Sequence, residues 1–507
     1  MIMNVPSAPD AIRRPYAGVL GVCLAASLWA SACSDPELAG SNFRCNSDAD
    51  CYVEEVCGPV EEELACRPRS ESPLRIGMSA PLQGPSRDLG NEMRRGINAL
   101  FSRVNEDRGG VFSRKLELVC LNDNYDPDTA RQVTEQLLDV RARNEHLDQP
   151  DVRGNDSVFA LLGSVGTPTM LATAPLATKN RVLFFAPFTG AQTYLRDGTH
   201  SPYVYNYRAG YYDEAEAIVD YLASARLPRI ISDPARDHRR LLVFAQEDSY
   251  GDAGYAGIVS AYNRRIGPLP SSDAIARVGY LREDVESVDP AIARTEQFLL
   301  DLLGDGTVRQ SAAIVMVDTY QPGSKLIRGV KDWLNQDATR ARQLDVLFIH
   351  VSFVGSDSLA LSLTSPPESY PDVTATDDST RASYAQGVMV TQVVPSYTSQ
   401  APTVAEYRAD IERFDGGAFS FTSLEGYIVA GLFVTALELN GPTLTTDGVR
   451  QVLETELDQL DVGIGTRLEL SADDHQASDT VWLSEIQRNG SFAVPFVWNP
   501  IQRILPN

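Results

Sequence analysis

The turn Gly163–Thr167 carries the residue types best suited to hold a small ligand. It follows the short apolar run Val158–Leu162, which we interpret as a fully buried strand, and it supplies two hydroxyl side chains, Ser164 and Thr167. Thr167 is also a good helix N-cap, with Pro168 at the first helical position. Such a turn aims free backbone N–H groups beyond the carboxyl ends of a parallel sheet, where open α/β folds bind ligands. The pattern predicts a site for a small anionic or zwitterionic molecule.

Sequence patterns typical of catalysis are absent. There is no G-x-S-x-G elbow, no H-E-x-x-H pair and no P-loop. The acidic pair Asp473-Asp474 lies in a predicted turn, where solvation explains it. The histidines are scattered along the chain, at His146, His200, His238, His350 and His475. We therefore expect a protein that is not an enzyme and that holds neither a metal nor a cofactor.

The elements that would position such a site alternate in type along the chain. Short apolar strands and amphipathic helices follow one another from Leu74 to about Val497, which is typical of an α/β fold with parallel sheets. The length of 507 residues exceeds one typical core, so we expect at least two domains. The pair Asp213-x-x-Glu216 predicts a capping box for a helix that ends near Ala223. The predicted strands are Leu74–Ser79, Lys115–Leu121, Val158–Leu162, Val182–Phe185, Leu241–Ala245, Ala312–Val317 and Leu344–Val351.

The composition excludes some classes of partner. The apolar content of 43% and aromatic content of 8% are ordinary for a globular protein. The formal net charge of −24 argues against nucleic acid and anionic membrane surfaces as partners, because both would repel the chain.

The N-terminal segment has the features of an export signal. Arg13 and Arg14 precede the apolar run Ala17–Ala32, which is too short to span a membrane comfortably and ends in small residues just before Cys33. We interpret residues 1–32 as a secretory signal peptide. Ala-Ser-Ala-Cys resembles the bacterial lipoprotein signal, which implies lipidation of Cys33, although Ala30 stands where that signal usually has Leu. Simple cleavage before Cys33 is the alternative. The residue after Cys33 is not acidic, which slightly favours the outer membrane.

Export makes the cysteine cluster interpretable. Cys45, Cys51, Cys57 and Cys66 follow a C-x5-C-x5-C-x8-C pattern within the predicted linker 33–72. In an oxidising envelope this pattern predicts two disulfides, with three possible pairings. A zinc site is the competing interpretation, but the C-x2-C spacing of zinc knuckles is absent. Cys120 alternates with apolar residues on a predicted strand, so we expect an unreactive buried thiol.

Seven segments, in order, resemble the type I periplasmic binding protein family, in particular its branched-chain amino-acid-binding members that serve ABC transporters. The resemblance extends over essentially all of residues 74–497. The segments are RIGMSAPLQG, GGVFSRKLELVCLNDNYDPDTA, LLGSVGTP, FFAPFTGA, EDSYG, LEGYIVAGLFVTALE and LELSADDHQASDTVWLSEI.

This resemblance implies two doubly wound parallel-sheet lobes that trap a ligand as they close. Three hinge crossovers would lie near Arg208, Thr391 and Ser471. The first lobe would comprise residues 73–207 and 392–470, and the second lobe residues 208–391 and 471–507.

The resemblance also implies binding residues. The family uses the loop containing Ser164 and Thr167 to hold a ligand carboxylate. In the second loop Thr189 would donate a hydrogen bond, while Phe188 is either a pocket wall or an exposed loop residue. On the second lobe Tyr250 matches an aromatic that contacts the ligand, and Tyr320 is the next candidate.

Ser352 departs from the family pattern. It matches the position where amino-acid binders carry an acidic residue for the ligand ammonium, while Asp357, five residues on, is expected to cap a helix. A buried ammonium without a carboxylate is costly, so a standard α-amino acid is in doubt. A neutral molecule, a simple carboxylate, or an ammonium held by Asp318 or Asp248 remains open.

Three functions follow from these observations. The first is a monomeric, lipid-anchored protein of the cell envelope that captures a small polar molecule and delivers it to an ABC permease. The second is a ligand sensor that signals to a membrane partner. The third is a scaffold whose pocket has degenerated, which Ser352 makes worth considering.

Overall fold

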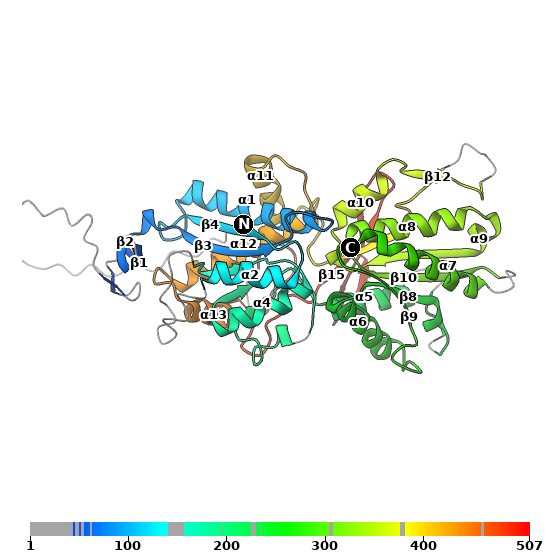
Figure 1. Cartoon of the computed structure of the whole chain (residues 1–507), viewed down its shortest axis with the longest axis horizontal. Coiled ribbons are helices and arrows are strands. Elements are labelled where there is room, and N and C mark those ends of the chain that lie inside the picture. Colours follow the sequence, from blue (N-terminus) through cyan, green and yellow to red (C-terminus); the bar gives the residue numbers. More distant parts are fainter. Residues whose placement is uncertain are drawn as a thin grey trace, which may run out of the picture.

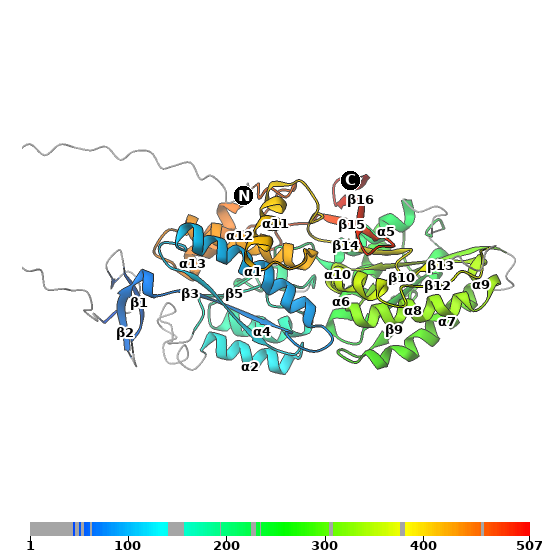
Figure 2. The ribbon, with the colours of Figure 1, turned by 90° about the horizontal axis from the view of Figure 1, so that it is seen from above.

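The computed structural model describes residues 44–45, 50–51, 55–60, 63–139, 157–192, 194–224, 230–233, 235–303, 308–375, 381–457 and 461–506. The predicted signal peptide and Cys33 lie outside these ranges. Figures 1 and 2 show two α/β lobes arranged along the long axis of the molecule, each built on its own sheet.

The sheet of the first lobe has five strands, all parallel to their neighbours. The burial of nearly every residue in its central strands explains the continuous apolar runs in the sequence. In spatial order the strands are β4 (Leu116–Asn122), β3 (Leu74–Ala80), β5 (Ala160–Leu162), β6 (Leu183–Phe185) and β7 (Val204–Tyr205).

The sheet of the second lobe has eight strands. Its parallel part consists of β9 (Ala276–Tyr280), β8 (Leu241–Gln246), β10 (Gln310–Val317), β11 (Leu344–His350) and β14 (Val388–Gln392). The C-terminal strands β15 (Val481–Ile486), β16 (Phe492–Asn499) and β17 (Arg503–Pro506) then extend the sheet with antiparallel pairing. The parallel α/β prediction is confirmed, and this antiparallel extension is the difference from it.

Helices cover both faces of each sheet. In the first lobe α1 (Arg87–Arg108) and α12 (Phe421–Asn440) lie on one face, with α11 (Pro402–Phe414) and α13 (Thr446–Thr455) beside them, while α2 (Pro127–Leu138) and α4 (Thr167–Lys179) lie on the other (Figure 2). Among the described residues, α12 alone is long and apolar enough to cross a membrane, but it is mostly buried in this core. A Cβ at Gly96 of α1 would overlap the carbonyl oxygen of Ser423, so glycine lets these two helices approach closely.

In the second lobe, alternate residues of β8 face opposite layers. Leu241 and Val243 contact the side of α5 (Tyr211–Ser224) and α6 (Ser249–Arg265), whereas Leu242 belongs to a separate core. That second core is formed with α7 (Asp289–Leu303), α8 (Tyr320–Asn335) and α10 (Ser356–Thr364), and the short α9 (Ala338–Gln343) follows α8. The hairpin of β12 (Ser369–Pro371) and β13 (Arg381–Ser383) lies outside the main sheet.

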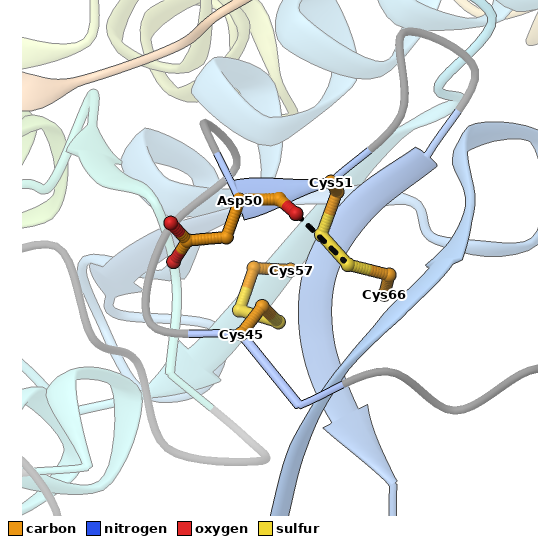
Figure 3. Close-up of a disulfide and its surroundings, with 5 residues drawn as sticks. All are labelled: Cys45, Asp50, Cys51, Cys57 and Cys66. Carbon is orange, nitrogen blue, oxygen red and sulfur yellow. Dashed lines mark hydrogen bonds between the residues drawn. A yellow bond between two sulfur atoms is a disulfide. The ribbon is translucent and has the colours of Figure 1, made fainter.

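The cysteine-rich segment forms a hairpin of β1 (Glu55–Val60) and β2 (Glu63–Pro68) at the far end of the first lobe (Figure 1). Figure 3 shows its two disulfides, Cys45–Cys57 and Cys51–Cys66, which select one of the three possible pairings. Cys120 of β4 is free and half-buried, and burial raises the pKa of its thiol to about 12. A thiol with a raised pKa is a weak nucleophile at neutral pH, as expected, although Cys120 is less buried than predicted.

The predicted capping box at the start of α5 is wrong. The helix begins at Tyr211, two residues before Asp213, and the Asp213 carboxylate accepts a hydrogen bond from the backbone N–H of Gly210 at 2.8 Å. Glu216 instead forms ion pairs with Arg264 and Arg265 of α6. The sequence pattern predicts the start of the helix three residues too late. Acidic residues occur throughout the first two turns of α5, so an acidic pair with this spacing does not mark where the helix begins.

Candidate functional site

Three hydroxyl groups meet where the two lobes join. They belong to Thr167 at the start of α4, Thr189 after β6 and Tyr211 at the start of α5. The Thr167 Oγ1 atom lies 2.7 Å from Thr189 Oγ1 and 3.3 Å from the Tyr211 hydroxyl, and all three side chains are buried. A Cβ at Gly190 would come within 2.3 Å of the Tyr211 ring, so this glycine permits the contact. We call Thr167, Thr189 and Tyr211 the hydroxyl cluster.

The helix cap expected at Thr167 lies one residue earlier. The N-cap of α4 is Gly166, whose φ of 109° favours glycine, and no side chain caps the helix. Gly166 also leaves room for Tyr125, since a Cβ there would lie 2.3 Å from the tyrosine ring. The Thr167 hydroxyl is therefore not used for capping and is directed toward the other members of the hydroxyl cluster.

The predicted free N–H groups of this turn are largely used within the protein. The backbone N–H of Val165 donates to Ser79 O at 3.0 Å, and that of Gly166 donates to Phe188 O at 3.1 Å. The Ser164 Oγ atom accepts a hydrogen bond from the backbone N–H of Ser79 at 3.1 Å. Ser164 thus fixes the loop and is not directed toward a ligand.

Aromatic rings fill the junction between the lobes. Phe353, which follows β11, lies 5.3 Å from Phe188 and 6.1 Å from Tyr125 of the first lobe, and 4.7 Å from Tyr250 of α6, measured between ring centroids. All four side chains are almost completely buried, so the exposed-loop interpretation of Phe188 is wrong. The Tyr250 hydroxyl donates to the backbone carbonyl of Asp318 at 3.0 Å. We call Tyr125, Phe188, Tyr250 and Phe353 the aromatic cluster.

Arg208 is the centre of a buried polar network. Its Nη2 atom donates to Ser352 Oγ, its Nε atom lies 3.6 Å from a carboxylate oxygen of Glu425, and its guanidinium carbon lies 4.4 Å from the centre of the Phe188 ring. Glu214 accepts hydrogen bonds from the backbone N–H of Ser352 at 2.6 Å and from its hydroxyl at 3.1 Å. The Thr391 hydroxyl also donates to Glu214. We call Arg208, Glu214, Ser352, Thr391 and Glu425 the Arg208 network.

The electrostatics of this network favour a charged guanidinium. Burial alone lowers the pKa of Arg208, but the nearby carboxylates of Glu425 and Glu214 outweigh it, and the net direction is upward. Burial raises the pKa of the Glu425 carboxyl to about 7, although the positive charge of Arg208 acts the other way. Within the described residues, the Nε and Nη1 atoms of Arg208 are buried and make no hydrogen bond. Arg208 therefore retains capacity to bind an anion.

The two other acidic candidates already have partners. Asp248 is the N-cap of α6, accepting from the backbone N–H of Tyr250 at 3.0 Å, and it pairs with Arg282 at 3.1 Å. Asp318 pairs with the Nδ1 atom of His350 at 2.8 Å. Asp248 cannot take a ligand ammonium without losing these contacts, whereas the Oδ2 atom of Asp318 is buried and has no hydrogen-bond partner within the described residues.

The structure does not bring Tyr320 into this site. The Tyr320 ring belongs to the second core of lobe two, whereas Tyr250 belongs to the core that continues into lobe one. Tyr320 lies beside Gly355 and Asp88, at another contact between the lobes. Asp357 does not cap α10, whose N-cap is Gly355; it accepts from the backbone N–H of Phe421 at 2.9 Å. Ser358 donates to Asp88 at 2.8 Å in the same region.

Seven residues of the site were not predicted from the sequence as site residues: Tyr125, Arg208, Tyr211, Glu214, Phe353, Thr391 and Glu425. Arg208 was placed only as a hinge position, although a lone arginine among apolar and aromatic residues (YNYRAGYY) was a usable signal. Glu214 gives no separate signal in the sequence, because Asp213 and Glu216 on either side of it fit a capping box. Position 352 itself carries no carboxylate, but the carboxylate of Glu214, from α5, contacts Ser352.

We expect the stability of the protein to fall as the pH rises through the neutral range. The Glu425 pKa, about 7 against an ordinary 4.5, means that folding favours the protonated acid. Its contribution is therefore complete below about pH 4.5 and lost as the pH rises to about 7, a change of roughly 3 kcal/mol at most. Urea unfolding between about pH 5 and about pH 8 should show a shallower pH dependence for Glu425→Gln than for the unsubstituted protein.

The surface variant Glu117→Gln is the matched control for this experiment, because Glu117 lies on the exposed side of β4 and pairs only with Arg75 among the described residues. Equal slopes for the unsubstituted protein and Glu425→Gln would show that Glu425 is ionised at all these pH values.

Comparisons with known proteins agree with this architecture. The sequence model of the periplasmic binding protein family matches residues 73–268. A possible leucine/isoleucine/valine-binding protein from Rhodopirellula baltica SH 1 is 32% identical over 84% of this chain and 97% of its own, with a TM-score of 0.64. No curated protein sequence gives a significant match.

Two more distant structures share the fold. The branched-chain amino acid transporter substrate-binding protein of Streptococcus pneumoniae, solved with isoleucine, is 13% identical, covers 86% of this chain and 100% of its own, and has a TM-score of 0.59. A solute-binding protein of an ABC transporter from Rhodopseudomonas palustris, solved with 3,4-dihydroxybenzoic acid, is 16% identical over 82% and 93%, with a TM-score of 0.58. The fold and the 32% identical relative together show that this chain belongs to the type I periplasmic binding protein family.

Proposed function

We propose that this protein captures a small carboxylate between its two lobes in the cell envelope and delivers it to an ABC permease, acting as a binding protein and not as an enzyme. The observation that carries the proposal is the buried guanidinium of Arg208, whose Nη1 atom makes no hydrogen bond within the described residues. A charged donor of this kind suits a carboxylate, because Arg–carboxylate hydrogen bonds are short, strong and directional.

The hydroxyl cluster supports the same ligand chemistry. Tyr211 stands close enough to Arg208 for the two to interact electrostatically, and Thr167 bonds to Tyr211. Three hydroxyls and a guanidinium offer several donors to one carboxylate. The ligands named for the compared structures, leucine, isoleucine, valine and 3,4-dihydroxybenzoic acid, share a carboxylate.

The network further favours a carboxylate that lacks an α-ammonium. In an amino-acid site a carboxylate near Ser352 would receive the ligand ammonium, but here Glu214 is engaged by Ser352 and Thr391, and Glu425 is paired with Arg208. A ligand ammonium would have to displace the positive charge of Arg208, and two cations close together in a buried site repel each other strongly.

Several finer assignments accompany this proposal. The lobes comprise residues 73–207 with 392–470 and residues 208–391 with 471–507, and they move about crossovers near Arg208, Thr391 and Ser471. Residues 1–32 act as a signal peptide, and lipidated Cys33 anchors a monomeric protein to the envelope membrane, with the outer membrane favoured. The sequence features of the N-terminus support the anchor, and the chain's three passages between the lobes support the hinge.

The proposal predicts a clear difference between two molecules of the same carbon skeleton. Thermal unfolding with 4-methylpentanoate at about a hundred times its dissociation constant should show a stabilisation of roughly 2.7 kcal/mol, whereas leucine, which adds only the ammonium, should give little or none. The amine 3-methylbutylamine, which lacks the carboxylate, should also be inactive. Stabilisation by leucine and not by the acid would contradict the proposed ligand class.

Two variants locate the binding. Thr167→Val removes one hydroxyl of the site without changing its volume and should weaken binding of the acid about tenfold, as expected for one hydrogen bond to a charged group. Thr173→Val is the matched control on the same helix, because the Thr173 hydroxyl is buried but bonds only to carbonyls of α4. Equal effects of the two substitutions would place the ligand elsewhere.

A non-binding scaffold is the second candidate, and one observation favours it. The lobes already contact each other through the aromatic cluster and through the hydrogen bonds of Ser86 with Glu283 and of Ser358 with Asp88. If carboxylates, amides, sugars and polyamines all leave the unfolding curve unchanged after refolding from denaturant, the junction would serve only to hold the two lobes together. A ligand sensor would give the same binding results as a transport protein and differs from it in the membrane partner.

A further inference from the structure

A cavity lies away from the Arg208 network, on the side of the molecule where the chain crosses between lobes. It has a volume of about 510 Å³ and is bounded by three walls: the loop 395–401, the segment 464–466, and one face of β15 and β16. Trp482 and Val497 are direct partners in the β15–β16 ladder, so their side chains lie on the same face of the sheet. None of the lining residues belongs to the hydroxyl cluster, the aromatic cluster or the Arg208 network.

The lining is entirely uncharged. Trp482, Phe492, Val497 and Ile464 supply apolar surface, and serine and threonine hydroxyls supply the polar atoms. The volume lies within the range of small-molecule sites. A charged molecule would lose its hydration there without gaining a counter-charge, which is costly. The chemistry therefore fits a neutral molecule with an apolar, ring-sized body.

One hydroxyl in the lining stands apart from the others. Ser396 and Thr398 bond to each other at 2.8 Å, and Ser399 accepts from the backbone N–H of Ala401 at 3.2 Å. The Oγ1 atom of Thr466 is buried and has no hydrogen-bond partner within the described residues. Buried polar atoms of proteins are normally satisfied, so the Thr466 hydroxyl is the lining hydroxyl that is left available to a bound molecule.

The position of the cavity connects it to the relative movement of the lobes. The loop 395–401 leads from β14 of the second lobe to α11 of the first, and the segment 464–466 precedes the return of the chain to β15. Figure 2 shows α11 on one side of this junction and β15 and β16 on the other. Because the walls come from both sides, rotation of the lobes changes the shape of the cavity.

We propose that this cavity is a regulatory site for a neutral aryl alcohol or a molecule of similar chemistry, which binds the hinge side and shifts the lobes between open and closed arrangements. The binding itself is independent of the proposed transport function, whereas the shift between lobe arrangements rests on it. A ligand that binds one arrangement better than the other changes its population in proportion to that difference.

The first test uses benzyl alcohol as the probe and benzylammonium as its charged counterpart, with binding followed by saturation-transfer NMR and by Trp fluorescence. We expect benzyl alcohol to bind with a dissociation constant of about 1–10 mM, the range for a ligand of this size, and benzylammonium not to bind. Thr466→Val should weaken binding about threefold to tenfold, while Thr435→Val on α12, whose hydroxyl bonds to its own helix, should not. Absence of binding, or equal binding of the two probes, would overturn the proposal.

A second variant keeps the test independent of one substitution. Val497→Trp fills the cavity and should abolish binding of benzyl alcohol while leaving the effect of 4-methylpentanoate on thermal unfolding in place. Retained binding of benzyl alcohol in Val497→Trp would place the probe elsewhere and contradict the proposal.

The regulatory part has its own readout. Benzyl alcohol should change the affinity for 4-methylpentanoate by the same factor by which 4-methylpentanoate changes the affinity for benzyl alcohol, because coupling between two sites is reciprocal. Binding of both molecules with no mutual effect would overturn the regulatory role and leave the site itself. Failure of 4-methylpentanoate to bind while benzyl alcohol binds would contradict the proposed transport function and not this cavity.

Discussion

Replacing Arg208 with methionine is expected to lower the free energy of unfolding by about 3–5 kcal/mol at neutral or alkaline pH. Methionine keeps much of the volume of the side chain but removes the positive charge that faces Glu214 and Glu425, both of which are almost completely buried. A buried carboxylate without a cation must either stay charged at high cost or take up a proton. The same substitution should abolish binding of 4-methylpentanoate.

Arg413→Met is the matched control for this effect. Arg413 also pairs with two carboxylates, those of Glu106 and Asp107, but its side chain is 47% exposed. Exposed ion pairs contribute at most about 1 kcal/mol, so this variant should unfold at nearly the same urea concentration as the unsubstituted protein. Equal losses in Arg208→Met and Arg413→Met would show that the buried network contributes no more than a surface pair.

A combined variant separates the charge from the packing. Arg208→Met together with Glu214→Gln and Glu425→Gln leaves no unpaired charge, so it should recover much of the stability lost in Arg208→Met alone. The recovery should be smaller near pH 5, since Glu425 with a pKa of about 7 is already largely protonated there. No recovery at any pH would mean that the loss comes from packing against Phe188 rather than from charge.

The parallel strands were predictable because they depend on local patterns. Apolar runs such as Leu241–Gln246 are buried on both faces, and their composition alone marks them as central parallel strands. The turn at Gly163–Thr167 was found for the same reason, since a small-residue turn between strand and helix is visible within a few residues. The antiparallel strands β16 and β17 were harder to predict, because their half-buried positions give a weaker pattern.

The network around Arg208 was not predictable from local patterns. Ser352 lies 144 residues from Arg208 and 138 residues from Glu214, and no periodicity indicates which of 68 acidic residues will face one buried arginine. The contact between Ser352 and Glu214 illustrates the difficulty. Position 352 carries a serine, yet the carboxylate of Glu214 from α5 contacts it, and only the arrangement of α5 against β11 determines that contact.

Replacing Phe353 with alanine is expected to cost about 3–5 kcal/mol of unfolding free energy and also to separate the lobes. Phe353 is fully buried and is the ring shared by Tyr125, Phe188 and Tyr250, so its removal takes away apolar contacts to both lobes at once. Loss of these contacts should shift the lobes toward an open arrangement. Urea unfolding would measure the first effect, and the radius of gyration from small-angle X-ray scattering would measure the second.

Phe348→Ala distinguishes the two effects, because Phe348 lies five residues earlier in β11 and is equally buried but contacts only the second core of lobe two. Both variants should lose similar stability, since both remove a buried phenylalanine ring. Only Phe353→Ala should increase the radius of gyration. If both variants keep the radius of the unsubstituted protein, the hydrogen bonds of Ser86 with Glu283 and of Ser358 with Asp88 hold the lobes together without the aromatic cluster.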